Sequence, residues 1–143
     1  YELSKWDEVL NINLRAPFLL TKILKTILED SKLPRIIFTS SGVANIGRAF
    51  WGAYSVSKFG LKGLAEIFAN ELETTSSIKV FNFDPEATQT KMRASARPAE
   101  DPNSIKTPHD LIECYLWFFS EESSHTKKRY FEYADLSKKV TST

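Results

Sequence analysis

Residues 35–58 read RIIFTSSGVANIGRAFWGAYSVSK, and this stretch decides the fold. It begins with an apolar, β-branched segment at 35–39, which is typical of a buried strand. A loop punctuated by glycines follows, and a helix is expected to begin near Gly52. Tyr54 and Lys58 are four residues apart, so on that helix they lie on one face, one turn from each other. The stretch therefore predicts a strand, a loop and a helix that carries a phenol beside an ammonium group.

Tyr54 and Lys58 form a candidate acid–base pair. A phenol loses its proton near pH ~10, and a fixed cation beside it favours the phenolate and lowers that pKa. A tyrosine tuned in this way can give or take a proton near neutral pH. The spacing alone occurs by chance on many helices. Ser41, 13 residues before Tyr54, ends the expected strand, where open α/β sheets place their ligands.

The composition is that of one globular domain. The chain has 143 residues, of which 42% are hydrophobic, and we treat residues 1–143 as a single domain with its own core. With 19 basic and 18 acidic residues it gives no electrostatic argument for binding nucleic acid or an anionic membrane. The single cysteine, Cys114, fits a reducing compartment, and we expect a cytoplasmic protein. Apolar runs near ~18 residues and a signal peptide are both lacking, so no membrane span is expected.

Helices and strands are expected to alternate on both sides of the deciding stretch. A helical period of apolar residues runs from about 4 to 29, with Pro17 as a weak point inside it. The helix of Tyr54 should extend over about 52–74. Its internal glycines, Gly60 and Gly63, suggest the close approach of another helix, from this chain or from a second subunit. The apolar run 78–83 predicts the next strand. This alternation predicts a parallel α/β sheet with flanking helices.

The C-terminal third has weaker signals. Residues 86–106 are polar and lack periodicity, which predicts a long loop that is either a lid or binding segment, or simply disordered surface. Thr107 starts a helix that reaches about residue 120. Residues 129–133 read as a last strand, and the tail 138–143 as frayed. His109 has no partner at metal-ligand spacing, so no metal site is expected.

The ordered motifs of this chain resemble the short-chain dehydrogenase/reductase family. Tyr54-x-x-x-Lys58 with Ser41 upstream matches the family's catalytic motif, and Asn13 matches the helix asparagine that completes its tetrad. The segment Asp84-Pro85-Glu86-Ala87-Thr88-Gln89-Thr90 is similar to the family's Pro-Gly-x-x-x-Thr segment. Residues 90–96 together with 106–108 further resemble a bacterial oxidoreductase subgroup typified by YciK. The resemblance implies a three-layer, Rossmann-like fold, of which this chain carries the C-terminal half.

The resemblance also implies roles for individual residues. Tyr54 would be the catalytic acid or base, and Lys58 would lower the Tyr54 pKa and bind the nicotinamide ribose. Ser41 would polarise the substrate carbonyl, and Asn13 would hold a water molecule in a proton relay to Lys58. Three further residues would line the nicotinamide of NAD or NADP, namely Pro85, Thr88 and Thr90. The substrate would be a carbonyl or alcohol compound, and a homodimer or homotetramer would form through the helices at about 4–29 and 52–74.

Two features depart from the family pattern. Glu86 stands where the family has glycine, and its charged side chain is expected to obstruct or repel the cofactor. The chain also contains no glycine-rich phosphate-binding loop. Three strand–helix–strand units of about 30 residues each would be missing, so we expect roughly a hundred further residues. Nicotinamide binding by these 143 residues alone should then be weak.

Two other readings remain open at this point. The chain could be a non-catalytic fragment or a degenerate homologue with a role in assembly, inactive alone because the cofactor-binding half is missing. It could also be a hydrolase, because Ser55-x-x-Lys58 matches the Ser-x-x-Lys motif of penicillin-recognising enzymes. The companion Ser-Asp-Asn motif of those enzymes is absent from the sequence, which counts against the hydrolase.

Overall fold

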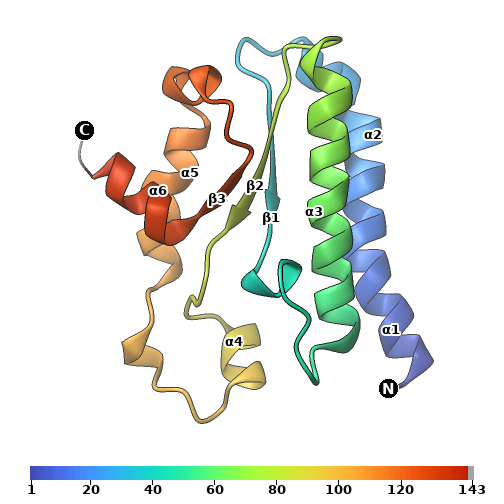
Figure 1. Ribbon diagram of the computed structural model, residues 1–143, viewed down its shortest axis with the longest axis vertical. Helices are drawn as coiled ribbons and strands as arrows, with labels where there is room; N and C mark the ends of the chain where they lie inside the picture. The colour runs from blue at the N-terminus through green and yellow to red at the C-terminus, as the bar shows by residue number, and fades with distance from the viewer. Residues whose placement is uncertain (142–143) are drawn as a thin grey trace.

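The computed structural model describes residues 1–141 and has a three-stranded parallel sheet at its centre (Figure 1). The strands are β1 (Arg35–Thr39), β2 (Lys79–Asp84) and β3 (Tyr130–Glu132), and they lie in the order β1-β2-β3. Arg35 pairs with Lys79 and Asn82 with Tyr130, so all three strands run in one direction. Their carboxyl ends therefore meet at one edge of the sheet, as the alternation of helices and strands predicts.

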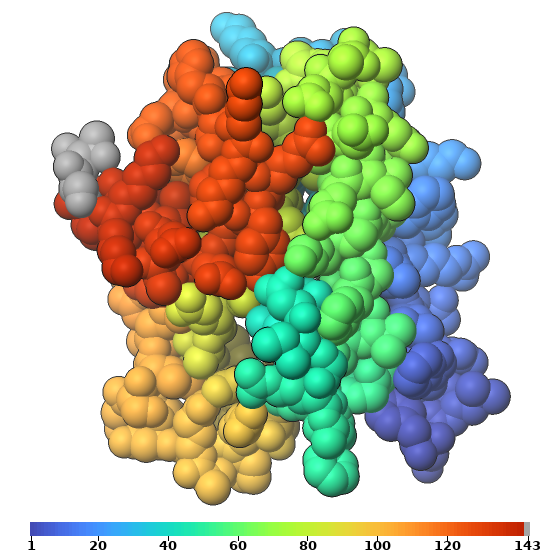
Figure 2. Space-filling view, in the orientation of Figure 1, coloured from blue at the N-terminus to red at the C-terminus, as the bar shows by residue number. Residues whose placement is uncertain are grey.

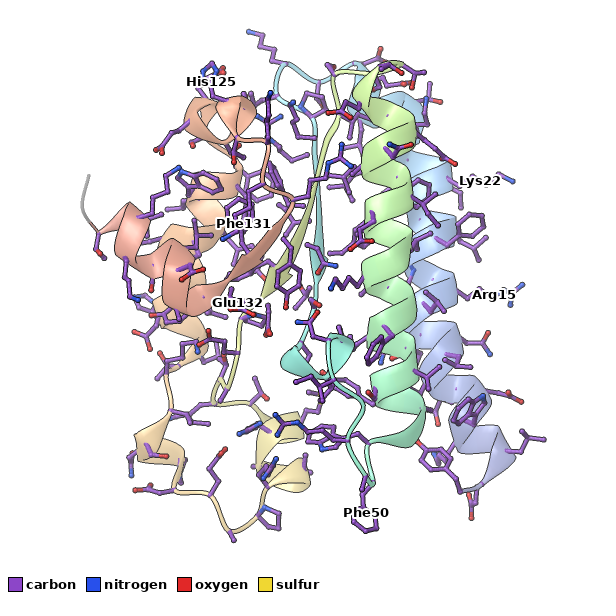
Figure 3. The ribbon with its side chains drawn as sticks, viewed as in Figure 1. Arg15, Lys22, Phe50, His125, Phe131 and Glu132 are labelled. Atoms are coloured by element: carbon purple, nitrogen blue, oxygen red, sulfur yellow. The ribbon has the colours of Figure 1, made fainter. Side chains whose placement is uncertain are left out.

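Helices cover both faces of this sheet and give three layers (Figure 1). On one face lie α1 (Leu3–Leu10), α2 (Ala16–Glu29) and α3 (Gly52–Glu73), and on the other lie α5 (Ile112–Phe118) and α6 (Tyr133–Val140). Each face has its own apolar cluster. Val80 packs with α3, whereas Phe81 and Phe83, whose side chains alternate with it along β2, pack with α5. Phe131 of β3 points into the second cluster, as Figure 3 shows. The three-layer, Rossmann-like architecture is thus confirmed.

The helical segment expected over 4–29 is continuous but changes its winding. A π-helical turn, Asn11–Arg15, joins α1 to α2, and Pro17 lies in the first turn of α2. Proline is tolerated there because a first-turn N–H has no partner within its own helix. The wider π turn makes the proline acceptable without breaking the segment. This turn also carries Asn13, one of the expected site residues.

The two glycines inside α3 have different surroundings. A Cβ on Gly60 would lie 2.8 Å from Leu14 Cδ2, so the close approach expected at this position is to a helical segment of the same chain. A Cβ on Gly63 would meet no atom within 4 Å. Gly63 therefore has no packing reason within the described residues, and its helix face is open.

The C-terminal third is more ordered than the sequence indicates. Residues 86–106 are not simply a loop, because they contain the short helix α4 (Lys91–Ala96), capped by the Thr90 hydroxyl, and a 3₁₀ turn at Pro102–Ser104. The expected start at Thr107 is confirmed by a reciprocal cap with Asp110, followed by a 3₁₀ turn and α5. The expectation of a frayed tail over 138–143 is wrong up to Val140, because α6 (Tyr133–Val140) continues to that residue. Residues 142–143 lie outside the described part. No helix within residues 1–141 has the length and apolar character needed to cross a membrane.

Candidate functional site

A cleft of about 680 Å³ opens at the carboxyl ends of β1 and β2. The loop after β1 forms one wall and the segment after β2 forms the other, and Figure 2 shows these two segments at the same end of the molecule. The expected site residues gather here although they are widely spaced in the chain. The cleft is lined by Asn13, Ser41, Tyr54, Lys58, Pro85, Thr88 and Thr90, among others.

Lys58 is fixed by the end of β1. Its Nζ donates a hydrogen bond to the Thr39 carbonyl oxygen at 2.8 Å and lies 5.7 Å from the centre of the Tyr54 ring. The two side chains therefore share one face of α3, as their spacing predicts. An ammonium group has three N–H donors, so the bond to Thr39 orients Lys58 while leaving donors for a ligand in the cleft.

The pKa of Tyr54 moves in the direction opposite to the expected one. Burial of the phenol raises its pKa, and the nearby Asp84 carboxylate adds to that effect. A hydrogen bond with Ser41 and the positive charge of Arg93 act the other way but are smaller. Burial also lowers the pKa of Lys58. Removal from water outweighs the neighbouring charges at Tyr54 in this structure, and the lowering of the Tyr54 pKa by Lys58 stays a prediction. Tyr54 is a protonated phenol at neutral pH.

Asn13 is linked through the Ser57 hydroxyl to the backbone carbonyl of Tyr54. Its Nδ2 donates to the hydroxyl of Ser57 at 3.1 Å, and that hydroxyl donates to the Tyr54 carbonyl oxygen at 2.7 Å. Ser57 is fully buried, so the link between the π turn and α3 is shielded from water. The amide of Asn13 reaches the same cleft as Lys58. Its role in holding a water molecule stays a prediction.

The threonines after β2 shape the wall of the cleft. Thr88 is buried, and its hydroxyl lies 3.3 Å from the carbonyl oxygens of Pro85 and Glu86. Its backbone forms an isolated parallel bridge with Lys106. Thr90 accepts a hydrogen bond from the Arg93 amide and so begins α4. Both hydroxyls hold this segment in shape, and both residues line the cleft.

Glu86, which stands where the family has glycine, adopts a glycine-like backbone conformation and has partners for its carboxylate. Its backbone has φ of 57°, a left-handed conformation that favours glycine and disfavours residues with a Cβ. Its carboxylate accepts a hydrogen bond from the Ala134 amide in the first turn of α6 at 3.1 Å, and lies 3.7 Å from Lys106 Nζ. A helix N-terminus and an ammonium group therefore compensate part of the Glu86 charge, and its expected effect on a cofactor stays a prediction.

Asp84 is a site residue that the motif does not single out. It is 3% exposed, lies at the end of β2, and burial raises its pKa. Its Oδ1 accepts a hydrogen bond from the Glu86 amide at 2.8 Å, and its Oδ2 lies 3.5 Å from the Tyr130 hydroxyl, which in turn accepts from Asn45. The sequence signal was a carboxylate ending an apolar strand. Its contact with Tyr130 of β3, and through Tyr130 its link to Asn45 in the loop after β1, are visible only in the folded chain.

The hydrolase interpretation of Ser55 finds no support in this geometry. Ser55 is buried and its hydroxyl donates to the Val43 carbonyl oxygen at 2.9 Å, so it does not face the cleft as a nucleophile would. Within residues 1–141 there is also no cluster of three or more metal-ligating side chains. The cleft is instead built around a phenol, an ammonium group and hydroxyls.

Known proteins share this arrangement. The sequence pattern of the family described as short chain dehydrogenase matches residues 1–101. The uncharacterized oxidoreductase YciK of Escherichia coli strain K12 is 42% identical over 118 residues, which are 82% of this chain and 46% of that protein. This confirms the resemblance to that bacterial subgroup.

Solved structures agree with the sequence matches. A short chain dehydrogenase from Salmonella enterica serovar Typhi strain CT18 superposes with a TM-score of 0.87 at 39% identity, over 92% of this chain and 54% of that one. A short chain dehydrogenase of Shigella flexneri 2a strain 301, complexed with NADP, gives a TM-score of 0.86 at 39% identity over the same shares. The chain thus spans about half the length of these relatives. By its sequence pattern, its parallel three-layer fold and these relatives, this chain belongs to the short chain dehydrogenase family.

Proposed function

We propose that the natural protein is an NAD(P)-dependent oxidoreductase that moves hydride between the nicotinamide and a carbonyl or alcohol carbon. The observation that carries this proposal is the gathering of Ser41, Tyr54 and Lys58 in one cleft with the segment 85–90. A non-catalytic remnant would not require these groups to lie together in one cleft. The NADP complex of the Shigella relative favours NADP over NAD as the partner cofactor.

The residues present fit the nicotinamide end of such a cofactor. Lys58 keeps donors beyond its bond to Thr39, and a ribose hydroxyl of the cofactor would accept one of them. Thr90 uses its oxygen as an acceptor toward Arg93, which leaves its O–H as a donor for a carboxamide. Pro85 presents no N–H and offers a flat apolar wall. When bound, the cofactor supplies the hydride, and the protein positions it.

Tyr54 would be the general acid or base that transfers the proton. As a protonated phenol, Tyr54 would donate its proton to the carbonyl oxygen during reduction, and as a phenolate it would accept a proton from the alcohol during oxidation. Ser41 would hydrogen-bond the same carbonyl oxygen and stabilise the negative charge that develops on it. Lys58 and the Asn13–Ser57 link would hold the phenol and its surroundings in place.

The oligomer expected from the family remains part of the proposal. Apolar side chains are exposed along α2 and α3, and they would be covered if these helices packed against a second copy. The exposed residues are Phe18, Leu20, Ile23 and Ile27 on α2, and Val56, Phe59 and Ile67 on α3. Gly63, open on the stripe of Phe59 and Ile67, would allow close helix contact.

Isotope transfer tests the proposed reaction. The natural full-length protein is incubated with NADPH deuterated at nicotinamide C4 and a panel of ketones and aldehydes. Deuterium on the carbinol carbon of a product supports the proposal. Products that carry no deuterium from either C4 position would contradict it.

A further inference from the structure

The cleft carries more positive charge than hydride transfer requires. Three arginines line it beside Tyr54: Arg48 from the loop after β1, Arg93 from α4, and Arg97 from the residue that follows α4. We call these the arginine cluster. Its members come from both walls of the cleft, so they face a common space.

Only one member of the arginine cluster forms an ion pair within residues 1–141, and Arg97 lies near enough to the same carboxylate, Glu100, to help lower its pKa. Arg93 binds Glu100 through two hydrogen bonds of 2.6 Å. Among residues 1–141, neither Arg48 nor Arg97 forms an ion pair. The other carboxylates of the cleft are also engaged, because Glu86 binds α6 and Lys106, and Asp84 binds the Glu86 amide. Arg48 therefore has no carboxylate partner in this part of the chain, and Arg97 shares Glu100 with Arg93 without an ion pair of its own, which leaves both guanidinium groups able to bind a ligand.

An aromatic surface joins Tyr54 to this charge. The centres of the Trp51 and Tyr54 rings are 5.6 Å apart. The Arg97 guanidinium in turn lies 5.9 Å from the centre of the Trp51 ring. Met92 lines the same cleft. A ligand with its carbonyl at Tyr54 would lay an apolar segment on Trp51 and place its far end at Arg97.

We propose that the substrate is a carbonyl compound that carries a carboxylate, separated from the carbonyl by an apolar segment, and that Arg97 and Arg48 bind this carboxylate. This inference rests on the proposed function. Guanidinium groups bind carboxylates through paired, charge-assisted hydrogen bonds. The phosphates of the cofactor offer a similar anion, so the experiment separates the two sources.

The test uses the natural full-length protein and a series of oxo acids from 4-oxopentanoate to 8-oxononanoate, each compared with its methyl ester. The acid should exceed its ester in kcat/KM by about tenfold for at least one member, a ratio that corresponds to about 1.4 kcal/mol. Arg97→Gln should remove that preference while the ester's kcat/KM and the KM for NADPH stay unchanged. Arg15→Gln, on a side chain that points outward from the helical layer (Figure 3), is the matched control.

Three results would overturn the inference. They are equal kcat/KM for every acid and ester pair, an unchanged preference in both Arg97→Gln and Arg48→Gln, or a rise in the KM for NADPH in place of the loss of preference. If no carbonyl compound is reduced, the proposed function fails. The inference about the carboxylate is then tested separately by measuring the binding of 8-oxononanoate and its methyl ester. The Trp51 indole signal in NMR should then shift with 8-oxononanoate but not with its ester, and Arg97→Gln should abolish the shift. Equal shifts with acid and ester would contradict the inference.

Discussion

The Nζ of Lys58 donates a hydrogen bond to the Thr39 carbonyl oxygen at 2.8 Å and thereby joins α3 to the last residue of β1. This bond places the ammonium 5.7 Å from the centre of the Tyr54 ring, and Lys58 forms no ion pair with any residue of the described range 1–141. Burial lowers the Lys58 pKa, and the backbone contact with Thr39 fixes where the ammonium lies. The arrangement makes Lys58 a fixed element of the cleft.

Replacing Lys58 should affect turnover more than folding. We expect Lys58→Met in the natural protein to lower kcat/KM by about 100-fold, the lower range for loss of acid–base assistance, because the cleft loses its oriented ammonium. Steady-state kinetics and circular dichroism measure the two effects. Lys127→Met, on an exposed lysine that does not line the cleft, should leave kcat/KM near the wild-type value. Equal losses in both variants would show that the effect is not specific to the cleft.

Glu86 should stabilise the segment after β2 through its side chain and strain it through its backbone. Glu86→Gln keeps an acceptor for the Ala134 amide but loses the charge, and we expect a cost of about 1 kcal/mol. Glu86→Gly loses the contact but relieves a left-handed conformation that costs about 1–2 kcal/mol. Its stability should therefore stay near the wild-type value.

Hydrogen exchange distinguishes these two Glu86 variants. Exchange of the Ala134 amide should accelerate strongly in Glu86→Gly and only slightly in Glu86→Gln, because only the glycine removes the acceptor. Unchanged exchange in Glu86→Gly would mean that the carboxylate does not hold the first turn of α6.

Asp84 should make stability depend on pH. Burial raises its pKa in the folded state above the value of about 3.9 in the unfolded chain. The folded protein therefore favours the protonated acid, and this contribution is full below the unfolded pKa and is lost as pH rises through the folded pKa. Asp84→Asn should thus gain stability relative to wild type as pH rises from about 4 toward neutrality. Urea unfolding of both proteins across this range measures the difference, and a gap that narrows with rising pH would contradict the assignment.

Gly63 tests the proposed helix-packed oligomer. Alanine is favoured over glycine inside a helix by about 1 kcal/mol, and a Cβ at Gly63 meets no atom of the same chain. Gly63→Ala should therefore stabilise α3 but weaken self-association of the natural protein by about tenfold, as measured by sedimentation. In Gly60→Ala the new Cβ would press on Leu14 of the same chain, so that variant should lose folding stability. Unchanged self-association in Gly63→Ala would place the interface elsewhere.

The parts of the fold that local pattern controls could be predicted from the sequence. The runs 35–39 and 78–83 are apolar and β-branched, and they became β1 and β2 within one residue. Tyr54 and Lys58 share a face because helix geometry fixes residues four apart. By contrast, α4 and α6 are short, and their starts depend on contacts with Thr90 and Glu86 that periodicity does not reveal.

The electrostatics of the site could not be predicted in this way. Burial raises the pKa of Tyr54, and its effect is larger than that of any neighbouring charge. The cleft that contains Tyr54 is lined by segments far apart in sequence. The same holds for Glu86, whose partner Ala134 is 48 residues away. Sequence reasoning found which groups meet in the cleft, but the protonation of those groups required the fold.

Tyr54→Phe in the natural full-length protein tests the central claim most directly, because it removes one hydroxyl and keeps the ring. NADPH-linked reduction of a substrate identified by deuterium transfer should fall by at least about 100-fold, with the NADPH dissociation constant and the circular dichroism spectrum unchanged. Full turnover in Tyr54→Phe would show that another group supplies the proton and would contradict the role of Tyr54 as the acid.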